Sequence, residues 1–296
     1  MTVFNPLNIR NKSFQWGKRT YIMGVLNVTP DSFSDGGDFN SLERALHQAQ
    51  HMVEAGVDII DIGGQSTRPG AEIVSLEIEL NRVIPLIETI RNSSNQLLAN
   101  IPISVDTTRS QVAKVAVQTG ADIINDISGA TFEAEMLSVV AGLQVPIILM
   151  HLRGTPKTMQ TLTDYQDLIG ELEGFLQGRI KEAIAQGIAP QNIIIDPGIG
   201  FAKTFKQNLE ILRNLTKLRS LNCPILVGTS RKSFIGHILN QPDPKQRVWG
   251  TAATCVAAIA NGADILRVHD VKEMVDVSQV ADAIYRVIDE GGNILS

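Results

Sequence analysis

Short aliphatic runs alternate along the chain with longer amphipathic stretches. Eight of these runs are rich in Val, Ile and Leu without interruption, as strands are when helices cover both faces of a parallel sheet. They span residues 20–26, 58–63, 102–107, 122–128, 146–151, 192–198, 224–230 and 264–270. The stretches between them, such as 42–56 and 109–120, have helical periodicity and end at glycine, a usual C-terminal stop for a helix.

This alternation predicts the fold class. Eight strand-then-helix units indicate an α/β protein with a (β/α)8 TIM barrel. The alternative, an open doubly wound sheet, more often has fewer strands and a glycine-rich phosphate turn, and the chain contains neither GxGxxG nor GxxxxGKS/T. We see no linker or repeat, so residues 1–296 are predicted to form one domain in which residues 1–19 are an N-terminal extension covering the barrel floor.

Polar residues follow each predicted strand at its C-terminal end. They are Asn27, the segment 63–70, Asp106, Asn125 with Asp126, His151, Asp196, the segment 230–232, and Arg267 with His269. Any single one is compatible with an ordinary helix N-cap or turn. Because the C-terminal strand ends of such a barrel meet at one face and carry the active site, the joint pattern favours an active site.

One half of this ring combines carboxylates, an amide and an ammonium group. Its members are Asp106, Asn125, Asp196 and Lys232. Carboxylates accept hydrogen bonds from amino-pyrimidine edges and lysine donates to oxygen or nitrogen, so the set suits a flat heterocycle with N–H donors and a carbonyl. An internal salt bridge between Asp196 and Lys232 is the alternative interpretation.

The other half is suited to an anion. It comprises Asn27, Ser66, Thr67, Arg68, Arg267 and His269. Arg267 and His269 alternate on one strand and therefore point to the same side. Arginine offers a forked donor and histidine can become charged near neutral pH, so a phosphate or diphosphate is the expected ligand. A barrel histidine satisfied by internal hydrogen bonds remains the alternative for His269.

A polar loop follows the first strand. Residues 27–38 contain Asp31, Asp35, Gly36 and Gly37 but no Lys or Arg. The amide oxygen of Asn27 beside a diphosphate, with the two aspartates, suits Mg²⁺, which keeps waters and shares phosphate oxygens. We predict that this loop folds over diphosphate and metal and excludes water; a rigid surface turn is the alternative.

The composition narrows the range of functions. The 296 residues carry a formal net charge of -5, which is not typical of nucleic-acid binding. The longest apolar runs, such as 145–150, are strand-sized, and no signal-peptide pattern is present, so neither a membrane partner nor export is expected. Cys223 and Cys255 lie far apart without a CxxC motif, which indicates buried thiols in a reducing compartment. A cytoplasmic location is predicted.

Eight motifs in order resemble the dihydropteroate synthase family of folate biosynthesis. They are MGVLNVTPDSFSDGG (23–37), DIGGQSTRPGA (61–71), ISVDTTR (103–109), INDISG (124–129), MHLRGTPKTMQ (150–160), IDPGIGFAKT (195–204), GTSRKSFIG (228–236) and LRVHD (266–270). The resemblance covers most of the chain. It implies a pterin-binding barrel in which 4-aminobenzoate displaces diphosphate from (7,8-dihydropterin-6-yl)methyl diphosphate, and it implies a homodimer.

The resemblance also implies roles for individual residues. The pterin pocket would comprise Asp106, Asn125, Asp196 and Lys232; the diphosphate site Asn27, Thr67, Arg267 and His269; the 4-aminobenzoate pocket Thr67, Arg68, Pro69, Phe201 and Ser233; the Mg²⁺ contact Asn27; and the catalytic set Asp106, Asp196, Lys232, Arg267 and His269. Many members have Glu at Gln65, Gly at Ala202 and Met at Leu152. None of these departures removes a residue with an implied role.

Two other functions were weighed against this one. A pterin-barrel methyltransferase that serves a corrinoid would share the carboxylate and amide contacts to the pterin, but it needs neither the diphosphate set nor the STRPG and SRKS segments. A non-catalytic pterin-binding protein would be expected to lose Lys232, Arg267 or His269. All three residues are present.

Overall fold

The computed structural model describes residues 5–28, 38–66, 70–72, 74–288 and 294–295. Eight parallel strands form its central sheet, in the order β8-β7-β6-β5-β4-β3-β10-β9. Their bounds are β3 Tyr21–Asn27, β4 Ile59–Gly63, β5 Ile103–Asp106, β6 Ile123–Asp126, β7 Ile147–Met150, β8 Ile193–Asp196, β9 Leu226–Val227 and β10 Ile265–Val268. A single bridge between Ile195 and Ile225 joins β8 to the β9 segment. The TIM-barrel prediction is therefore confirmed, with strands somewhat shorter than their apolar runs.

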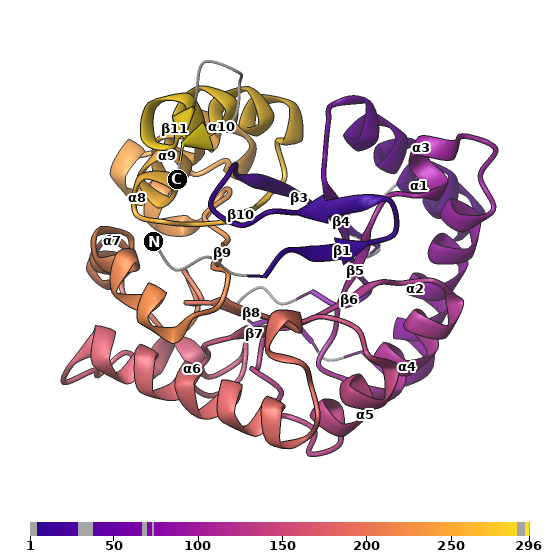
Figure 1. The fold of residues 1–296 in the computed structure, drawn as a ribbon, viewed down its shortest axis with the longest axis horizontal. Coiled ribbons are helices and arrows are strands. Elements are labelled where there is room, and N and C mark those ends of the chain that lie inside the picture. The colour runs from indigo at the N-terminus through magenta and orange to yellow at the C-terminus, as the bar shows by residue number, and fades with distance from the viewer. Residues whose placement is uncertain (1–4, 29–37, 67–69, 73, 289–293, 296) are drawn as a thin grey trace.

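Helices surround the strands on the outside of the barrel (Figure 1). They are α1 Asp38–Glu54, α2 Leu76–Arg91, α3 Gln96–Ala99, α4 Ser110–Thr119, α5 Met136–Leu143, α6 Leu168–Ala185, α7 Phe205–Asn214, α8 Ser233–Leu239, α9 Val248–Ala260 and α10 Val271–Tyr285. Short 3-10 helices lie at Met159–Thr161, Pro190–Asn192, Leu215–Leu221 and Pro244–Arg247. Helix α4 ends where Gly120 adopts a φ of 124°, as the glycine stop predicts. Within the described ranges, no helix is long and apolar enough to cross a membrane.

The core has two layers because successive strand residues face opposite sides. In β3, Ile22 and Leu26 pack outward against the helices, where the larger apolar cluster lies. Tyr21 and Met23 of the same strand point into the barrel, where they meet Ile59 and other strand residues in a second cluster. The strand interiors are thus apolar on both faces, as the sequence pattern indicates.

An N-terminal hairpin closes one end of the barrel. Strands β1 (Leu7–Ile9) and β2 (Lys12–Phe14) pair antiparallel, and they lie across the near end of the barrel in Figure 1. Phe14 stacks with Trp16 at a centroid distance of 5.7 Å and meets Tyr21 at 4.8 Å. Phe14 and Trp16 also belong to the inner cluster of the barrel. The prediction that the N-terminal segment covers the barrel floor is confirmed for residues 5–19, the part of it that the structure describes.

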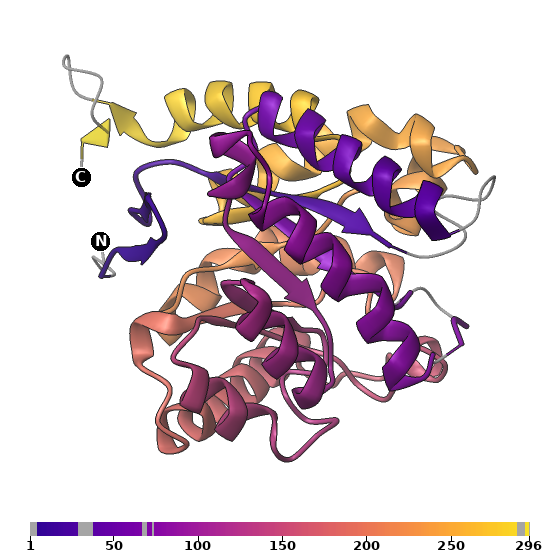
Figure 2. The same ribbon diagram turned by 90° about the vertical axis from the view of Figure 1, so that its right-hand side faces the viewer.

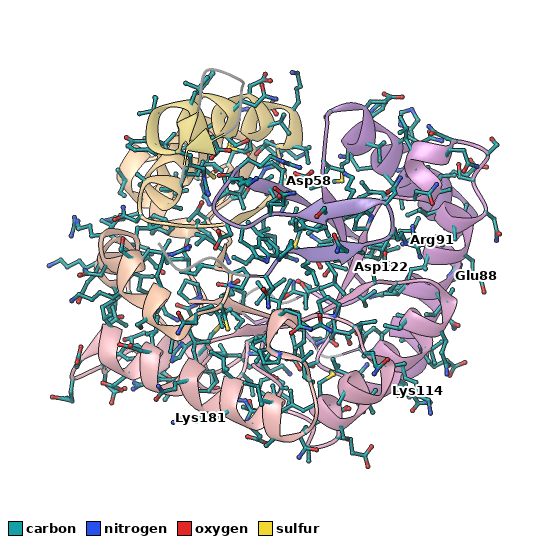
Figure 3. All side chains as sticks on the ribbon, in the orientation of Figure 1. Asp58, Glu88, Arg91, Lys114, Asp122 and Lys181 are labelled. Carbon is teal, nitrogen blue, oxygen red and sulfur yellow. The ribbon has the colours of Figure 1, made fainter. Side chains whose placement is uncertain are left out.

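Ion pairs fasten the hairpin to the loops beneath it. Arg10 Nε lies 2.7 Å from Asp122 Oδ1, and Arg91 Nη2 lies 2.7 Å from the other oxygen of the same carboxylate (Asp122 and Arg91 are labelled in Figure 3). Arg19 binds Asp58 through both guanidinium ends, at 2.9 and 2.6 Å. In the side view the strand arrows point away from this hairpin (Figure 2). The C-terminal strand ends therefore lie at the opposite end of the barrel.

The chain also contains a short C-terminal ribbon. Strand β11 (Val287–Ile288) pairs antiparallel with β12 (Ile294–Leu295) after α10 ends. Figure 2 places this ribbon at the same end of the molecule as the N-terminal hairpin. The ribbon is therefore remote from the C-terminal strand ends.

Candidate active site

The predicted polar residues that the structure describes gather at the C-terminal strand ends. Asn27 ends β3, Asp106 ends β5, Asn125 lies in β6, Asp196 ends β8 and Arg267 lies in β10. Lys232 is the N-cap residue of α8, with Ser233 as the first helical residue. Asp106, Asn125 and Asp196 are buried. The barrel thus brings together side chains from sequence positions far apart, as the ring interpretation requires.

Two predicted segments lie outside the described residues. Thr67, Arg68 and Pro69 of the second loop are not among them, and neither are residues 29–37, which include Asp31 and Asp35. Their implied roles toward 4-aminobenzoate, diphosphate and metal remain predictions. The site is therefore built from the strand ends and from the loops after β8, β9 and β10.

Arg267 holds two carboxylates together at the centre of the ring. Its Nε donates to Asp61 Oδ2 at 2.6 Å, and its Nη2 donates to Asp106 Oδ2 at 2.7 Å. The amide of Asn125 donates to the same Asp61 oxygen at 3.1 Å. Arg267 was predicted to belong to the anion half of the ring. Its guanidinium in fact also contacts Asp106 of the heterocycle half, so it connects the two halves. One cation balancing two buried carboxylates leaves this cluster favourable for a ligand that carries N–H donors.

Asp61 is a site residue that the sequence analysis missed. It lies in the middle of β4 with an exposure of 0%, and its Oδ1 has no hydrogen-bond partner among the described residues. The signal was an aspartate between Ile60 and Ile62 in a strand apolar on both faces. A charged residue there is costly unless it is paired, which predicts a buried cation nearby.

Gly63 allows the neighbouring polar residues to approach. A Cβ on Gly63 would lie 3.2 Å from Asn27 Oδ1 and 3.7 Å from Asp106 Cβ. Strand β4 lies between the strands that carry these two residues. The absence of a side chain at Gly63 therefore keeps the space between the Asn27 amide and the Asp106 carboxylate open.

Asp196 and Lys232 do not form the internal salt bridge considered as an alternative. Among the ion pairs of the described residues none joins them; instead Lys232 Nζ lies over the ring of Phe201, 4.2 Å from its centroid. Asp196 Oδ1 accepts a 2.7 Å hydrogen bond from the backbone N–H of Gly198. Both charged groups are therefore placed at the site without neutralising each other directly.

Burial shifts the protonation of these groups toward neutrality. It raises the pKa of Asp196 to about 6, against the opposing effects of the Gly198 N–H and Lys232. Burial likewise raises the pKa of Asp106, although Arg267 lowers it. Burial and then Arg267 lower the pKa of Lys232 to about 8. Such opposed shifts in one cluster are typical of functional sites.

His269 is oriented by Ser230. The Ser230 Oγ accepts from the His269 backbone N–H at 3.1 Å and lies 3.0 Å from His269 Nδ1. Because a hydroxyl that accepts one hydrogen bond still has its own proton to donate, Ser230 can donate to Nδ1 and favour the tautomer with the proton on Nε2. Ser230 belongs to the polar segment 230–232 predicted at the end of the seventh strand, but the sequence assigned it no role of its own, since a serine after a strand is most often a turn residue.

These features define a barrel enzyme whose C-terminal face holds a carboxylate-lined site for an amino-heterocycle. The model of one protein family, described as "Pterin binding enzyme", matches residues 23–269. The chain belongs to this pterin binding enzyme family.

Known proteins of this kind are similar over almost the whole chain. The dihydropteroate synthase of Synechocystis is 61% identical over 95% of this chain and 96% of its own length. A Xanthomonas albilineans dihydropteroate synthase solved with 4-aminobenzoic acid is 40% identical, with a TM-score of 0.86 over 95% of this chain and 98% of that chain. The enzyme from the same organism in complex with 7,8-dihydropteroate is 38% identical, with a TM-score of 0.82 over 95% and 98% of the two chains. The resemblance stated from the motifs is thereby confirmed.

Proposed function

We propose that this protein is a transferase of folate biosynthesis, a dihydropteroate synthase. It joins (7,8-dihydropterin-6-yl)methyl diphosphate to 4-aminobenzoate and releases 7,8-dihydropteroate and diphosphate. The observation that carries the proposal is the buried cluster in which Arg267 holds Asp61 and Asp106 beside Asn125, in a chain 61% identical to a dihydropteroate synthase. The carboxylates of Asp106 and Asp196 accept hydrogen bonds from the amino-pyrimidine edge of the pterin, and Lys232 donates to its oxygen or nitrogen atoms.

The chemistry follows from the charges in the ring. The amine of 4-aminobenzoate is neutral at cellular pH and forms the new C–N bond with its lone pair, while the C–O bond to diphosphate breaks and the leaving group takes that electron pair. The nitrogen then loses one proton. Arg267, His269 and Asn27 stabilise the charge that grows on the leaving diphosphate. Asp106 and Asp196 offset positive charge at the pterin methylene, so the barrier for C–O cleavage falls.

Mg²⁺ fits the residues at the anion half. Asn27 supplies an amide oxygen that faces the gap kept open by Gly63, and no group of three His, Cys, Asp or Glu residues suited to a metal occurs within the described ranges. A hard cation held by one protein oxygen, diphosphate oxygens and waters is the usual arrangement for Mg²⁺. When bound, it neutralises charge on the diphosphate.

The aminobenzoate pocket lies next to Lys232. Phe201 is half-buried and faces the Lys232 ammonium, and Ser233 is exposed at the start of α8. Phe201 would pack against the aromatic ring, and Ser233 together with Thr67, Arg68 and Pro69 would bind the remaining part of 4-aminobenzoate. The neighbouring Xanthomonas structure with 4-aminobenzoic acid supports a binding site for this substrate.

We further propose a cytoplasmic homodimer. Helices α9 and α10 carry large apolar side chains at the surface, among them Trp249 with an exposure of 77% and Ile284 with 66%. Exposed aromatic residues such as Trp249 are enriched in protein–protein interfaces. Cys223 and Cys255 are both buried and free, which is consistent with a reducing compartment. Light scattering coupled to gel filtration tests the dimer directly.

The decisive experiment is product formation from the two substrates with and without Mg²⁺. We expect dihydropteroate and diphosphate in equal amounts, and loss of turnover when EDTA removes the metal. Tight binding of the pterin diphosphate without product would instead make the protein a binder. Methyl transfer from methyltetrahydrofolate to a corrinoid, with no dihydropteroate formed, would replace the proposal with the methyltransferase.

A further inference from the structure

Lys203 is a buried lysine outside the ring of predicted site residues. Its exposure is 3%, and it lies in the loop between β8 and α7, two residues after Phe201. Its Nζ lies 3.1 Å from His151 Nδ1 and donates to the Phe201 carbonyl oxygen at 2.8 Å. Burying a lysine costs free energy of folding unless its N–H groups are hydrogen-bonded. These contacts lie outside the predicted ring, so their role is in what they position.

The donors and acceptors of this contact match. Burial, with a further effect of Lys203, lowers the pKa of His151 to about 2, so the ring is neutral and Nδ1 can accept. Burial lowers the pKa of Lys203 to about 7. The structure provides two acceptors for the N–H groups of Lys203, His151 Nδ1 and the Phe201 carbonyl oxygen.

His151 is a rigid anchor for this contact. It is 2% exposed, its backbone N–H donates to Asp196 O at 2.9 Å, and its ring packs edge-on against Phe175 at a centroid distance of 4.9 Å. The loop after β8 packs closely against His151: a Cβ on Gly198 would lie 2.1 Å from the His151 carbonyl oxygen. Through Lys203, the buried His151 at the end of β7 is thus hydrogen-bonded to Phe201 in the loop after β8.

We propose that Lys203 is a positioning residue of the aminobenzoate subsite: through its bonds to His151 and to the Phe201 carbonyl it holds the Phe201 ring beside Lys232. This inference rests on the proposed function. The hydrogen bonds of Lys203 go to His151 and Phe201 and not to the pterin carboxylates. Its charge acts on Asp196 only at longer range, so the main effect of losing Lys203 is expected on the second substrate. Tyr165, which donates to the Ala202 carbonyl at 3.0 Å, holds the next residue and leaves the Phe201 carbonyl to Lys203.

The test is Lys203→Met, which keeps the length of the side chain but removes the N–H donors that bind His151 and Phe201. We expect the KM for 4-aminobenzoate to rise about 10-fold, in line with the loss of a buried hydrogen-bonded contact, while kcat and the KM for the pterin diphosphate change less than about 2-fold. The matched control is Lys206→Met, an exposed lysine at the start of α7, which should change none of the three. An equal rise in both KM values, or an unchanged KM for 4-aminobenzoate, would overturn the proposal.

Histidine variants supply a second arm. His151→Asn keeps an acceptor near the place of Nδ1 and should retain most of the affinity for 4-aminobenzoate, whereas His151→Leu should behave as Lys203→Met does. Amide hydrogen exchange of residues 198–203, measured without substrates, should be faster in Lys203→Met and unchanged in Lys206→Met. Hydrogen exchange tests the link from His151 through Lys203 to Phe201 even if the wild type forms no dihydropteroate. Unchanged exchange in Lys203→Met would contradict the positioning role of Lys203.

Discussion

At the scale of single residues, Asp61 has the widest influence on the site. Its Oδ2 receives hydrogen bonds from both Arg267 and Asn125, so one carboxylate orients a cation and an amide that face the ligand. Asp61 itself is fully buried. A residue placed in this way determines the geometry of its neighbours more than it determines affinity directly.

Replacing Asp61 with Asn should therefore lower kcat/KM. The charge that balances Arg267 is lost and the amide can present a donor toward the guanidinium, so we expect a decrease of about 10- to 100-fold, the worth of one hydrogen bond to a charged group. Steady-state kinetics with both substrates measures it. Asp58→Asn is the control, because Asp58 binds Arg19 at the barrel floor: it should lower stability and leave kcat/KM unchanged. Equal kinetic effects of the two substitutions would contradict this role of Asp61.

Asp196 predicts a dependence of stability on pH. Burial raises its pKa from 3.8 to about 6, so the folded state binds the proton more tightly than the unfolded state. Its stabilising contribution is therefore complete below the unfolded pKa and is lost as the pH rises through the folded value. At about pH 8, Asp196→Asn should increase the free energy of unfolding by about 2–3 kcal/mol.

Urea unfolding of both proteins between about pH 5 and pH 8 measures this difference. It should shrink toward the acidic end, because the wild-type carboxyl is then protonated when folded. A difference that does not change with pH would show that the carboxyl charge is not its source. Lower activity of Asp196→Asn is expected in the same preparations, since the carboxylate is needed for the pterin.

Residue types alone allowed most of the ring to be predicted, and the failures have physical causes. Asp106, Asn125, Asp196 and Arg267 were found because polar residues stand out at the ends of apolar strands. Asp61 was missed because it lies inside a strand, and only the pairing of both β4 and β10 with β3 brings it close to Arg267. Lys203 was missed because a lysine in a loop is normally solvated, and its burial depends on packing against β7.

At the scale of elements, the loop after β8 is the part most constrained by its backbone. Gly198 has a φ of 69°, and its missing side chain leaves room for the His151 carbonyl. Ala202 has a φ of 50° and is buried, in a region where alanine is strained and glycine is not. The glycine that the resemblance implies for many family members at this position would adopt this conformation without strain.

Gly198→Ala should destabilise the protein by about 3 kcal/mol, because both the left-handed backbone and the contact with the His151 carbonyl oppose a Cβ. The same substitution at Gly174, in the middle of α6 with no atom within 4 Å of an added Cβ, should stabilise by about 1 kcal/mol. Thermal unfolding of the two variants should therefore shift in opposite directions. Melting temperatures that shift in the same direction in both variants would contradict the different roles of the two glycines.

At the scale of the whole molecule, the two barrel ends have separate tasks. The floor is filled by the aromatic side chains of the N-terminal hairpin, and the opposite end carries the polar ring. The eight strands and their order were predictable because each strand is apolar on both faces and neighbours in sequence are neighbours in a barrel. The ion pairs of the hairpin could not be predicted from the sequence, since Arg10, Arg91 and Asp122 come together only when the barrel has closed.

Phe14→Ala separates these tasks experimentally. Phe14 has an exposure of 0%, so truncation should reduce the free energy of unfolding by about 3–5 kcal/mol. kcat/KM measured well below the melting temperature should stay unchanged, because the ring lies at the other end. Leu97→Ala, at a side chain with an exposure of 74%, serves as the control and should stay within about 0.5 kcal/mol. A large loss of kcat/KM in folded Phe14→Ala would contradict this division.

The pairing of β3 with β10 has a consequence for how the protein is made. It sets Tyr21 beside Ile265, so β3 must wait for a partner strand that is translated after the six other strands of the barrel. At roughly 5–20 residues per second, the growing sheet keeps an open edge on β3 for many seconds, and an open edge is where chains pair with one another. The barrel can therefore close only after β10 has been translated.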